Sequence, residues 1–295
     1  MPFANDLLRA IADKNSRVCV GLDPMPDRLP PEIAVDSGDP RKTLDAVYAF
    51  VVGVLDAVSE TAACVKFQSA YFERFHGDGV DAYFELVHEA KQKGLLVIGD
   101  AKRGDIGTTS AAYADAHLAP YFGGDDSETP DALTVNPMLG LDTIEPFVDV
   151  AAEHGKGLFV LVRTSNPGSV ETQNVALADG RMWSEHLADL LAPVAEANAT
   201  DDVSLIGAVV GATQPDAMTS LRQRLPKSIF LLPGYGAQGG TAATARAAFA
   251  DGTPGAIVSA SRSVLYPQRE SGESWQTAVA RAAKAVRDDL NNVVG

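Results

Sequence analysis

The sequence predicts an α/β fold, a (β/α)8 TIM barrel that forms a single domain, residues 1–295, with an additional N-terminal helix. Three observations predict it. Eight short apolar runs rich in β-branched residues recur along the chain, and a segment with helical periodicity follows each run. Such runs are typical of parallel strands buried on both faces. Polar residues and glycines gather where the runs end, as in barrel enzymes. An open, doubly wound sheet is the alternative arrangement of the same units.

We expect the eight apolar runs to form the strands of the barrel. In chain order they are VCVGL from Val18, CVKF from Cys64, LLVIG from Leu95, ALTV from Ala132, GLFVLV from Gly157, LIGAVVG from Leu205, IFLL from Ile229 and AIVSA from Ala256.

Helices are expected before, between and after these runs. Phe3, Leu7 and Ile11 fall on one helical face at the N-terminus. Asp39–Pro40 supply an N-cap and a first-turn proline for an apolar stripe over 44–58. The other helices are expected near 79–93, 108–118, 142–154, 183–198, 214–225, 240–250 and 274–291.

Composition and charge narrow the possible functions. The net charge of −15 argues against nucleic acid or an anionic membrane as a partner. No segment reaches 18 uninterrupted apolar residues, and the N-terminus lacks the pattern of a secretory signal. Cys19 and Cys64 lie within apolar runs, so we expect buried, reduced thiols and a cytoplasmic protein.

Other polar residues are expected to be unremarkable. The five histidines show no metal-ligand spacing, so we expect them at the surface and predict no metal site. The acidic stretch at 123–131 is expected to be a solvated loop. The segment at 165–182 is too long for a routine connection and is expected to be a lid or an insertion.

A charged cluster is predicted after the second and third runs. Asp100 and Lys102 are two residues apart, so on an extended chain both side chains point into the barrel. Lys66 ends the neighbouring strand, and Asp105 follows on a glycine-flanked turn. Two carboxylates and two ammonium groups can therefore converge, each lysine beside anions that favour its charged form. A salt-bridge network that only closes the barrel end is the alternative interpretation.

A phosphate site is predicted after the seventh and eighth runs. PGYGAQGG at 233–240 and SASRS at 259–263 lie where barrels often bind phosphate. Glycines let backbone N–H groups approach the oxygens, and Arg262 can donate paired hydrogen bonds to them.

With these motifs in place, the chain resembles the orotidine 5′-phosphate decarboxylase family. DAKRGDIGTT at 100–109 resembles the family signature, and VKFQ with Lys66 matches the family's other catalytic lysine. Asp23, SNPGS at 165–169, PGYGAQGG and SASRS extend the resemblance over most of 17–265. The length of the chain resembles the branch with extended loops (type 2), which leaves 27–40 and 165–182 without assigned roles.

The resemblance implies that the chain converts orotidine 5′-monophosphate (OMP) to UMP and CO2 in de novo pyrimidine biosynthesis, without a cofactor. Lys102 would be the general acid that protonates C6 of the pyrimidine. Asp100 would lie near the substrate carboxylate and hold Lys102 in place. Lys66 would contact the ribose and fix Asp100. Loss of CO2 leaves a carbanion at C6 that the ring cannot delocalise as an enolate. Catalysis therefore requires preorganised charge near C6 and a proton donor.

The resemblance also implies a homodimer. Asp105 would reach into the partner subunit's site, accompanied across the interface by Ile106 and Thr109. Asp23 would bind a ribose hydroxyl.

The remaining substrate contacts follow from the same resemblance. Ser165 would contact the edge of the base, and Gln238 would bridge the phosphate and the pyrimidine. Gly239, Tyr235 and Arg262 would form the phosphate pocket.

Three other functions stay open. One is a Mg²⁺-dependent sugar-phosphate enzyme of the same barrel superfamily, such as a hexulose-phosphate synthase, which shares the D-x-K-x-x-D run. In those enzymes the resemblance implies an acidic metal ligand at the end of the second strand, where this chain has Lys66. A protonated lysine repels Mg²⁺. A Schiff-base aldolase that uses Lys66 or Lys102 and a non-catalytic phosphate-binding barrel are the others.

Overall fold

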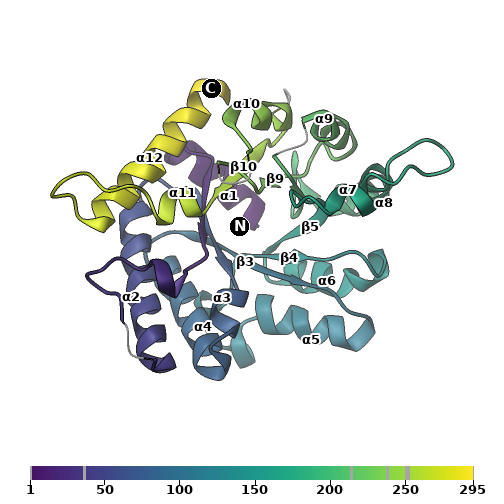
Figure 1. Ribbon diagram of the computed structural model, residues 1–295. Helices are drawn as coiled ribbons and strands as arrows, with labels where there is room; N and C mark the ends of the chain where they lie inside the picture. The colour runs from purple at the N-terminus through teal and green to yellow at the C-terminus, as the bar shows by residue number, and fades with distance from the viewer. Residues whose placement is uncertain (1, 36–37, 213–214, 237–238, 250–252, 295) are drawn as a thin grey trace.

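Eight parallel strands close into a barrel with helices around it (Figure 1), so the predicted fold is confirmed and the open sheet is excluded. The computed structural model describes residues 2–35, 38–212, 215–236, 239–249 and 253–294. Around the barrel the strands follow the order β1-β10-β9-β8-β5-β4-β3-β2. Within the described ranges, no helix is both long and apolar enough to cross a membrane.

The barrel strands coincide with the predicted runs. They are β1 Val18–Leu22, β2 Cys64–Gln68, β3 Leu96–Arg103, β4 Ala132–Val135, β5 Gly157–Arg163, β8 Ile206–Val210, β9 Phe230–Leu232 and β10 Ala256–Ala260. Three of them, β1, β4 and β10, match residue for residue. A short antiparallel pair that the sequence did not predict, β6 Ala199–Thr200 and β7 Val203–Ser204, precedes β8.

The long helices also follow the prediction. They are α1 Phe3–Asp13, α2 Pro40–Val58, α4 His76–Gln92, α5 Gly107–Leu118, α6 Glu145–Glu153, α8 Trp183–Ala197, α9 Pro215–Arg224 and α12 Trp275–Val294. The side chain of Asp39 accepts a hydrogen bond from Arg41 N, as expected of an N-cap. Figure 1 shows α12 beside α2, where Trp275 packs on Phe50.

Several short helices lie outside the prediction. They are α3 Ala70–Glu73, α7 Ser169–Gln173, α11 Arg262–Leu265 and the 3₁₀ turns η1 Pro26–Arg28, η2 Tyr121–Gly123 and η3 Asp126–Glu128. A further 3₁₀ turn, η4 Leu141–Thr143, lies at the start of the helix expected near 142–154. The helix expected over 240–250 is shorter, with α10 Ala242–Ala245 followed by η5 Arg246–Ala248. Thr241 caps its start, and at Phe249 the backbone leaves the helical region, with the ring lying against Gly255 just before β10. The chain has to turn there to enter the last strand.

The interior of the barrel is layered from apolar to polar. Phe3 and Leu7 of α1 pack with Cys19, Cys64 and other interior residues in one buried cluster that fills the N-terminal end. Both cysteines are buried and free, as predicted. Interior positions follow the period of two along a strand, so the next inward residues after Cys64 are Lys66 and Gln68. On β2, polar side chains therefore enter the barrel toward its C-terminal end.

One surface prediction is wrong, and another holds only in part. His117 is only 8% exposed, because the end of α5 packs against Phe84 of α4. The acidic stretch at 123–131 is only partly solvated. Its Asp126 lies 2.7 Å from the ammonium group of Lys156, which is 2% exposed. A buried ammonium group requires such a counter-charge.

Candidate active site

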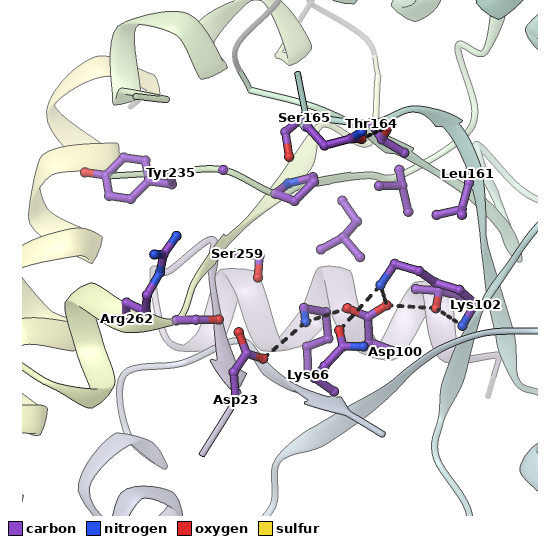
Figure 2. A pocket seen from close by; sticks show the side chains of 18 residues that line it. Asp23, Lys66, Asp100, Lys102, Leu161, Thr164, Ser165, Tyr235, Ser259 and Arg262 are labelled. Atoms are coloured by element: carbon purple, nitrogen blue, oxygen red, sulfur yellow. Dashed lines mark hydrogen bonds and ion pairs between the residues drawn. The ribbon is translucent and has the colours of Figure 1, made fainter. Parts of the chain in front are cut away.

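A cavity of about 410 Å³ opens at the C-terminal ends of the strands (Figure 2). Its walls come from all eight strands of the barrel or from the loops that follow them. They are lined by Asp23, Lys66, Gln68, Asp100, Lys102, Thr134, Leu161, Thr164, Ser165, Asn166, Val209, Leu231, Pro233, Gly234, Tyr235, Ser259, Ser261 and Arg262. The lining combines apolar residues such as Leu161, Val209 and Leu231 with polar and charged ones, which suits a ligand with both characters.

Asp100 lies between two lysines in this cavity. Its Oδ2 is 2.7 Å from Lys66 Nζ, and its Oδ1 is 2.5 Å from Lys102 Nζ. Asp100 and Lys66 are each 6% exposed, whereas the side chain of Lys102 is 45% exposed. The structure therefore brings three of the four predicted charges together, with Lys102 at the open side.

The electrostatics keep the buried pair ionised. Burial alone would lower the pKa of Lys66, but the charges of Asp100 and Asp23 outweigh it and raise that pKa well above its ordinary value. Burial would likewise raise the pKa of Asp100, yet the two lysines hold it well below its usual range. Both groups are therefore charged at neutral pH.

Strand β3 reaches this geometry through an irregular backbone. Its register with β4 shifts between Gly99 and Arg103, and Lys102 has a φ of 49°, which is rare for a residue with a side chain. Lys102 N donates to Thr134 Oγ1 at 3.0 Å, and this hydroxyl donates to Asp100 Oδ1 at 3.0 Å. The simple extended alternation used in the sequence argument is wrong at Lys102. The bulge directs this side chain toward Asp100 instead.

Sequence reasoning missed two partners of this array, Thr134 and Gln68. Gln68 Oε1 accepts from Lys102 Nζ at 3.4 Å. Both residues are polar and stand at the C-terminal ends of apolar runs, so the signal that identified Lys66 was available for them as well.

The cavity continues from the charged array toward Arg262, the first residue of α11. Figure 2 shows a row of side chains along one wall, in the order Arg262, Asp23, Lys66, Asp100 and Lys102. Asp23 Oδ1 is buried, lies 3.9 Å from Lys66 Nζ and makes no hydrogen bond within the described residues. Tyr266 supports this wall, since its hydroxyl oxygen accepts from Met25 N at 2.6 Å.

Ser165 and Tyr235 both line the cavity. Figure 2 shows Ser165 and Thr164 across the cavity from Lys66. The hydroxyl of Tyr235 points away and donates to the carboxylate of Asp289 on α12, so only the body of this side chain lines the cavity. Both burial and Asp289 raise the pKa of Tyr235.

Other predicted site residues lie elsewhere. Asp105, Ile106 and Thr109, at the start of α5, are not among the residues that line the cavity, and Ile106 is 63% exposed. Gly239 is exposed, donates its N–H to Gly236 O at 3.0 Å and does not line the cavity either. Gln238 lies outside the described residues.

The arrangement suits an anionic ligand. One end of the cavity offers the guanidinium of Arg262, and the other offers Lys102 with Asp100 beside it. Among the described residues, no group of three or more His, Cys, Asp or Glu side chains is placed to hold a metal ion.

Comparisons with known proteins agree on one family. Residues 16–273 match the model of the Orotidine 5′-phosphate decarboxylase / HUMPS family. The orotidine 5′-phosphate decarboxylase of Deinococcus radiodurans is 41% identical over 296 residues, covering 99% of this chain and 98% of the relative. The orotidine 5′-phosphate decarboxylase of Rhodopirellula baltica is 39% identical over 300 residues, covering 98% and 99%.

Solved structures give the same picture. A Streptomyces avermitilis crystal structure superposes with a TM-score of 0.82 at 36% identity, covering 100% of this chain and 96% of the other. Leishmania donovani OMP decarboxylase superposes with a TM-score of 0.74 at 28% identity, covering 99% and 98%. From the match over most of its length and from these full-length relatives, the chain belongs to the orotidine 5′-phosphate decarboxylase / HUMPS family.

Proposed function

We propose that this chain decarboxylates OMP to UMP and CO2 as a cofactor-independent carboxy-lyase of pyrimidine biosynthesis. One observation carries the proposal. The ionised bridge from Lys66 through Asp100 to Lys102 lines the same cavity as Arg262. This cavity therefore offers a cation for a phosphate and a proton donor at a separate point.

The proposed reaction uses Lys102 as the general acid. The bond between C6 and the carboxylate carbon breaks, CO2 leaves, and the electron pair stays on C6. Lys102 Nζ delivers a proton to C6, and the neutral amine then regains a proton from water. Asp100, held by Lys66 and Thr134, keeps the ammonium group in place. Its negative charge near the substrate carboxylate also favours departure of that group.

The substrate would lie along the row of polar side chains. Arg262 would bind the phosphate by paired hydrogen bonds, with Gln238, Gly239 and Tyr235 as further members of that pocket. The buried Oδ1 of Asp23, which makes no hydrogen bond within the described residues, is suited to accept from a ribose hydroxyl.

The pyrimidine would lie between the charged array and Ser165, which would contact the edge of the base. Binding energy from the remote phosphate can then contribute to the chemical step. A positioned general acid alone gives about 10²–10⁴ in rate, so the rest must come from such binding and from the fixed charges.

A metal-dependent sugar-phosphate enzyme is the nearest rival. Lys66 argues against it, because this buried ammonium occupies the end of β2 and its positive charge would repel Mg²⁺ from the centre of the cavity. The relatives that cover nearly all of this chain at 39–41% identity carry the decarboxylase name.

The test is turnover of OMP by the wild-type protein in the presence of EDTA, followed by the loss of orotate ultraviolet absorbance. We expect turnover that EDTA leaves unchanged. Turnover that requires added Mg²⁺ would indicate the metal-dependent rival. Absence of turnover with and without Mg²⁺ would leave only a non-catalytic barrel or another substrate.

We further propose that the active form is a homodimer in which Asp105 acts in the partner subunit's site. Asp105, Ile106 and Thr109 lie outside the cavity of their own subunit, which supports a role elsewhere. Three large apolar side chains, Ile106, Met138 and Leu139, are 63%, 73% and 57% exposed at this end of the barrel. Asn136 N donates to Arg103 O, so their two loops are adjacent. An apolar patch of this kind is typical of an interface.

Mixing two inactive variants tests the shared site. Lys102→Ala and Asp105→Ala homodimers each lack one catalytic group in both sites. After subunit exchange, a mixed dimer rebuilds one intact site if Asp105 acts in trans, so partial activity should return. No recovery, with exchange verified by mass, would contradict the shared site.

The remaining assignments are proposals of the same kind. We place the chain in the extended-loop (type 2) branch, because its 295 residues include structured loops such as 165–182, with α7 and a bridge between Ala176 and Met182. Residues 1–295 would form one domain, since the strands of one barrel run from β1 to β10 and α1 packs on the barrel interior. The two free cysteines favour the cytoplasm.

A further inference from the structure

Arg163, the last residue of β5, is a completely buried cation beside the cavity. Its Nη1 donates to Thr164 O at 3.0 Å, to Gln173 Oε1 at 3.1 Å and to the hydroxyl of Ser169. Arg163 takes no part in the mechanism proposed above.

No carboxylate accompanies this guanidinium in the described part of the chain. All three partners of Nη1 are neutral, and Nε and Nη2 make no hydrogen bond within the described residues. Burial lowers the pKa of Arg163, yet arginine stays protonated at neutral pH. Burying an uncompensated charge is costly, so a protein without use for it would be more stable with an apolar residue there.

Arg163 and Gln173 together hold the loop that lines the cavity. Gln173 Oε1 accepts from Thr164 N at 2.8 Å, and Gln173 Nε2 donates to Thr164 Oγ1 at 3.0 Å. Thr164, Ser165 and Asn166 all line the cavity. Behind them the register of β5 with β8 shifts between Leu161 and Arg163, so regular strand pairing ends where this loop begins.

Gly211 makes room for the same loop from the side of β8. A Cβ at this position would lie 3.0 Å from Ser165 Cα and 3.1 Å from Ser165 N, tighter than most real contacts. Ser165 is therefore held between Gly211 and the hydrogen-bonded Thr164. The guanidinium of Arg163 bonds the carbonyl of the peptide unit that joins Thr164 to Ser165, so its charge lies one peptide unit from Ser165.

We propose that Arg163 is a positioning residue for the reaction, holding residues 164–166 against the cavity and keeping an uncompensated positive charge behind the side where Ser165 faces the substrate. The inference rests on the proposed decarboxylase function. As CO2 leaves, negative charge moves from the carboxylate into the pyrimidine ring. A fixed positive potential beside the ring stabilises that state more than the bound substrate, so it acts mainly on kcat.

The charge can be tested without removing Arg163. Gln173→Glu keeps an acceptor oxygen for Arg163 Nη1 and Thr164 N and adds a negative charge that compensates the guanidinium. Gln173→Met has a similar length, removes all the hydrogen bonds of the Gln173 amide and adds no charge, so it shows what the loss of these bonds alone does. The measurements are kcat and KM for OMP and the melting temperature of both variants and of the wild type.

We expect Gln173→Glu to melt at or above the wild type, because it pairs a buried cation, and to melt above Gln173→Met. Its kcat should fall at least about tenfold below that of the wild type, with KM within about threefold. If the role of Arg163 were purely structural, Gln173→Glu would be more stable than the wild type and at least as active.

A kcat of Gln173→Glu equal to that of the wild type would overturn the proposal, as would a Gln173→Glu protein that is less stable than Gln173→Met. The wild type measured in parallel separates this inference from the proposed function. If the wild type itself does not turn over OMP, the decarboxylase assignment fails, and the order of the two melting temperatures still decides whether Arg163 is an uncompensated charge.

Discussion

Lys66 carries its charge in a place where an isolated ammonium group would lose it. Burial disfavours the charged form, and the carboxylates of Asp100 and Asp23 restore it. The same pairing keeps Asp100 ionised against its own burial. Each residue is therefore tolerated only because of the other, and this arrangement fixes the charge beside Lys102.

Removing Asp100 should therefore cost stability as well as activity. For Asp100→Leu we expect a loss of about 3 kcal/mol in the free energy of unfolding, because Lys66 is left buried without its partner. The double variant Lys66→Met/Asp100→Leu should recover most of that loss while remaining inactive. Urea denaturation and OMP turnover measure the two effects separately. A double variant no more stable than Asp100→Leu would contradict this view of the pair.

His117 should make the stability depend on pH. Burial lowers its pKa from 6.5 to about 4, so between these values the unfolded chain binds a proton that the native state does not. Stability is therefore full above pH 6.5 and falls as the pH drops to 4, by about 3 kcal/mol for this shift of about 2.5 units.

Replacing His117 by Phe should flatten this slope between pH 6.5 and 4 in chemical denaturation. The exposed His76, changed to Asn, is the control and should leave the slope as in the wild type. Asp100 acts mainly below this window, and its contribution is the same in His117→Phe and in the control. An unchanged slope in His117→Phe would show that His117 is not the group responsible.

At this scale the sequence predicted charges better than their neutral partners. Lys66, Asp100 and Lys102 stand out because charged residues are rare at the ends of buried strands. Thr134 and Arg163 were not assigned, since a hydroxyl is common in strands and the burial of an arginine depends on how a distant loop folds over it. The burial of His117 likewise depends on how two helices pack, which periodicity alone does not determine.

At the scale of elements, two strands end in irregular pairing beside the cavity. The register of β3 with β4 shifts between Gly99 and Arg103, and the register of β5 with β8 shifts between Leu161 and Arg163. Bulges re-aim side chains and often lie next to active sites. Here they direct Lys102 toward Asp100 on one side and deliver Thr164 and Ser165 to the other.

Thr134 is the residue that ties the β3 bulge to β4. Thr134→Val removes the acceptor for Lys102 N and the donor to Asp100, so we expect a fall in kcat of about tenfold and a loss of about 1 kcal/mol in stability. Thr143→Val is the control, because that threonine is equally buried and its hydroxyl donates only to Gly140 O.

Steady-state kinetics and thermal unfolding of the two variants distinguish their roles. Both should lose similar stability, and only Thr134→Val should lose kcat. Equal kcat in both variants would mean that the bulge holds Lys102 without help from Thr134.

The sequence predicted the strands more closely than the short helices. Strands buried on both faces read as continuous apolar runs, so their ends are visible in the sequence. The segment at 240–250 has high helix propensity from its alanines, but the need to re-enter the barrel at Ala256 limits it to α10 and a 3₁₀ turn. Propensity is a weak guide where the tertiary path decides.

For the whole molecule, charge is distributed unevenly. The chain has a net charge of −15, yet Lys66, Lys102 and Arg262 all line one cavity. Local cations of this kind can attract a phosphorylated substrate against the overall field. The acidity of the rest of the surface therefore does not argue against an anionic substrate.

The exposed apolar residues at the mouth of the barrel should hold the proposed dimer together. We expect Leu139→Glu to shift the protein toward monomers in analytical ultracentrifugation and to lower OMP turnover in parallel, because a charge is costly in an apolar interface. Leu190→Glu, at a residue that is 43% exposed on α8, is the control and should stay dimeric. Monomeric Leu139→Glu protein with full activity would contradict the shared site.

The most direct test of the account is OMP turnover by Lys102→Ala. The side chain of Lys102 is 45% exposed, and Asp100 keeps Lys66 as its partner when Lys102 is removed, so the variant should fold. We predict that its kcat is at least ~10² lower than that of the wild type, as expected for loss of a general acid. The exposed Lys284, changed to Ala, should have no effect. Near-wild-type turnover by folded Lys102→Ala would contradict the central claim that this lysine, held by Asp100, delivers the proton.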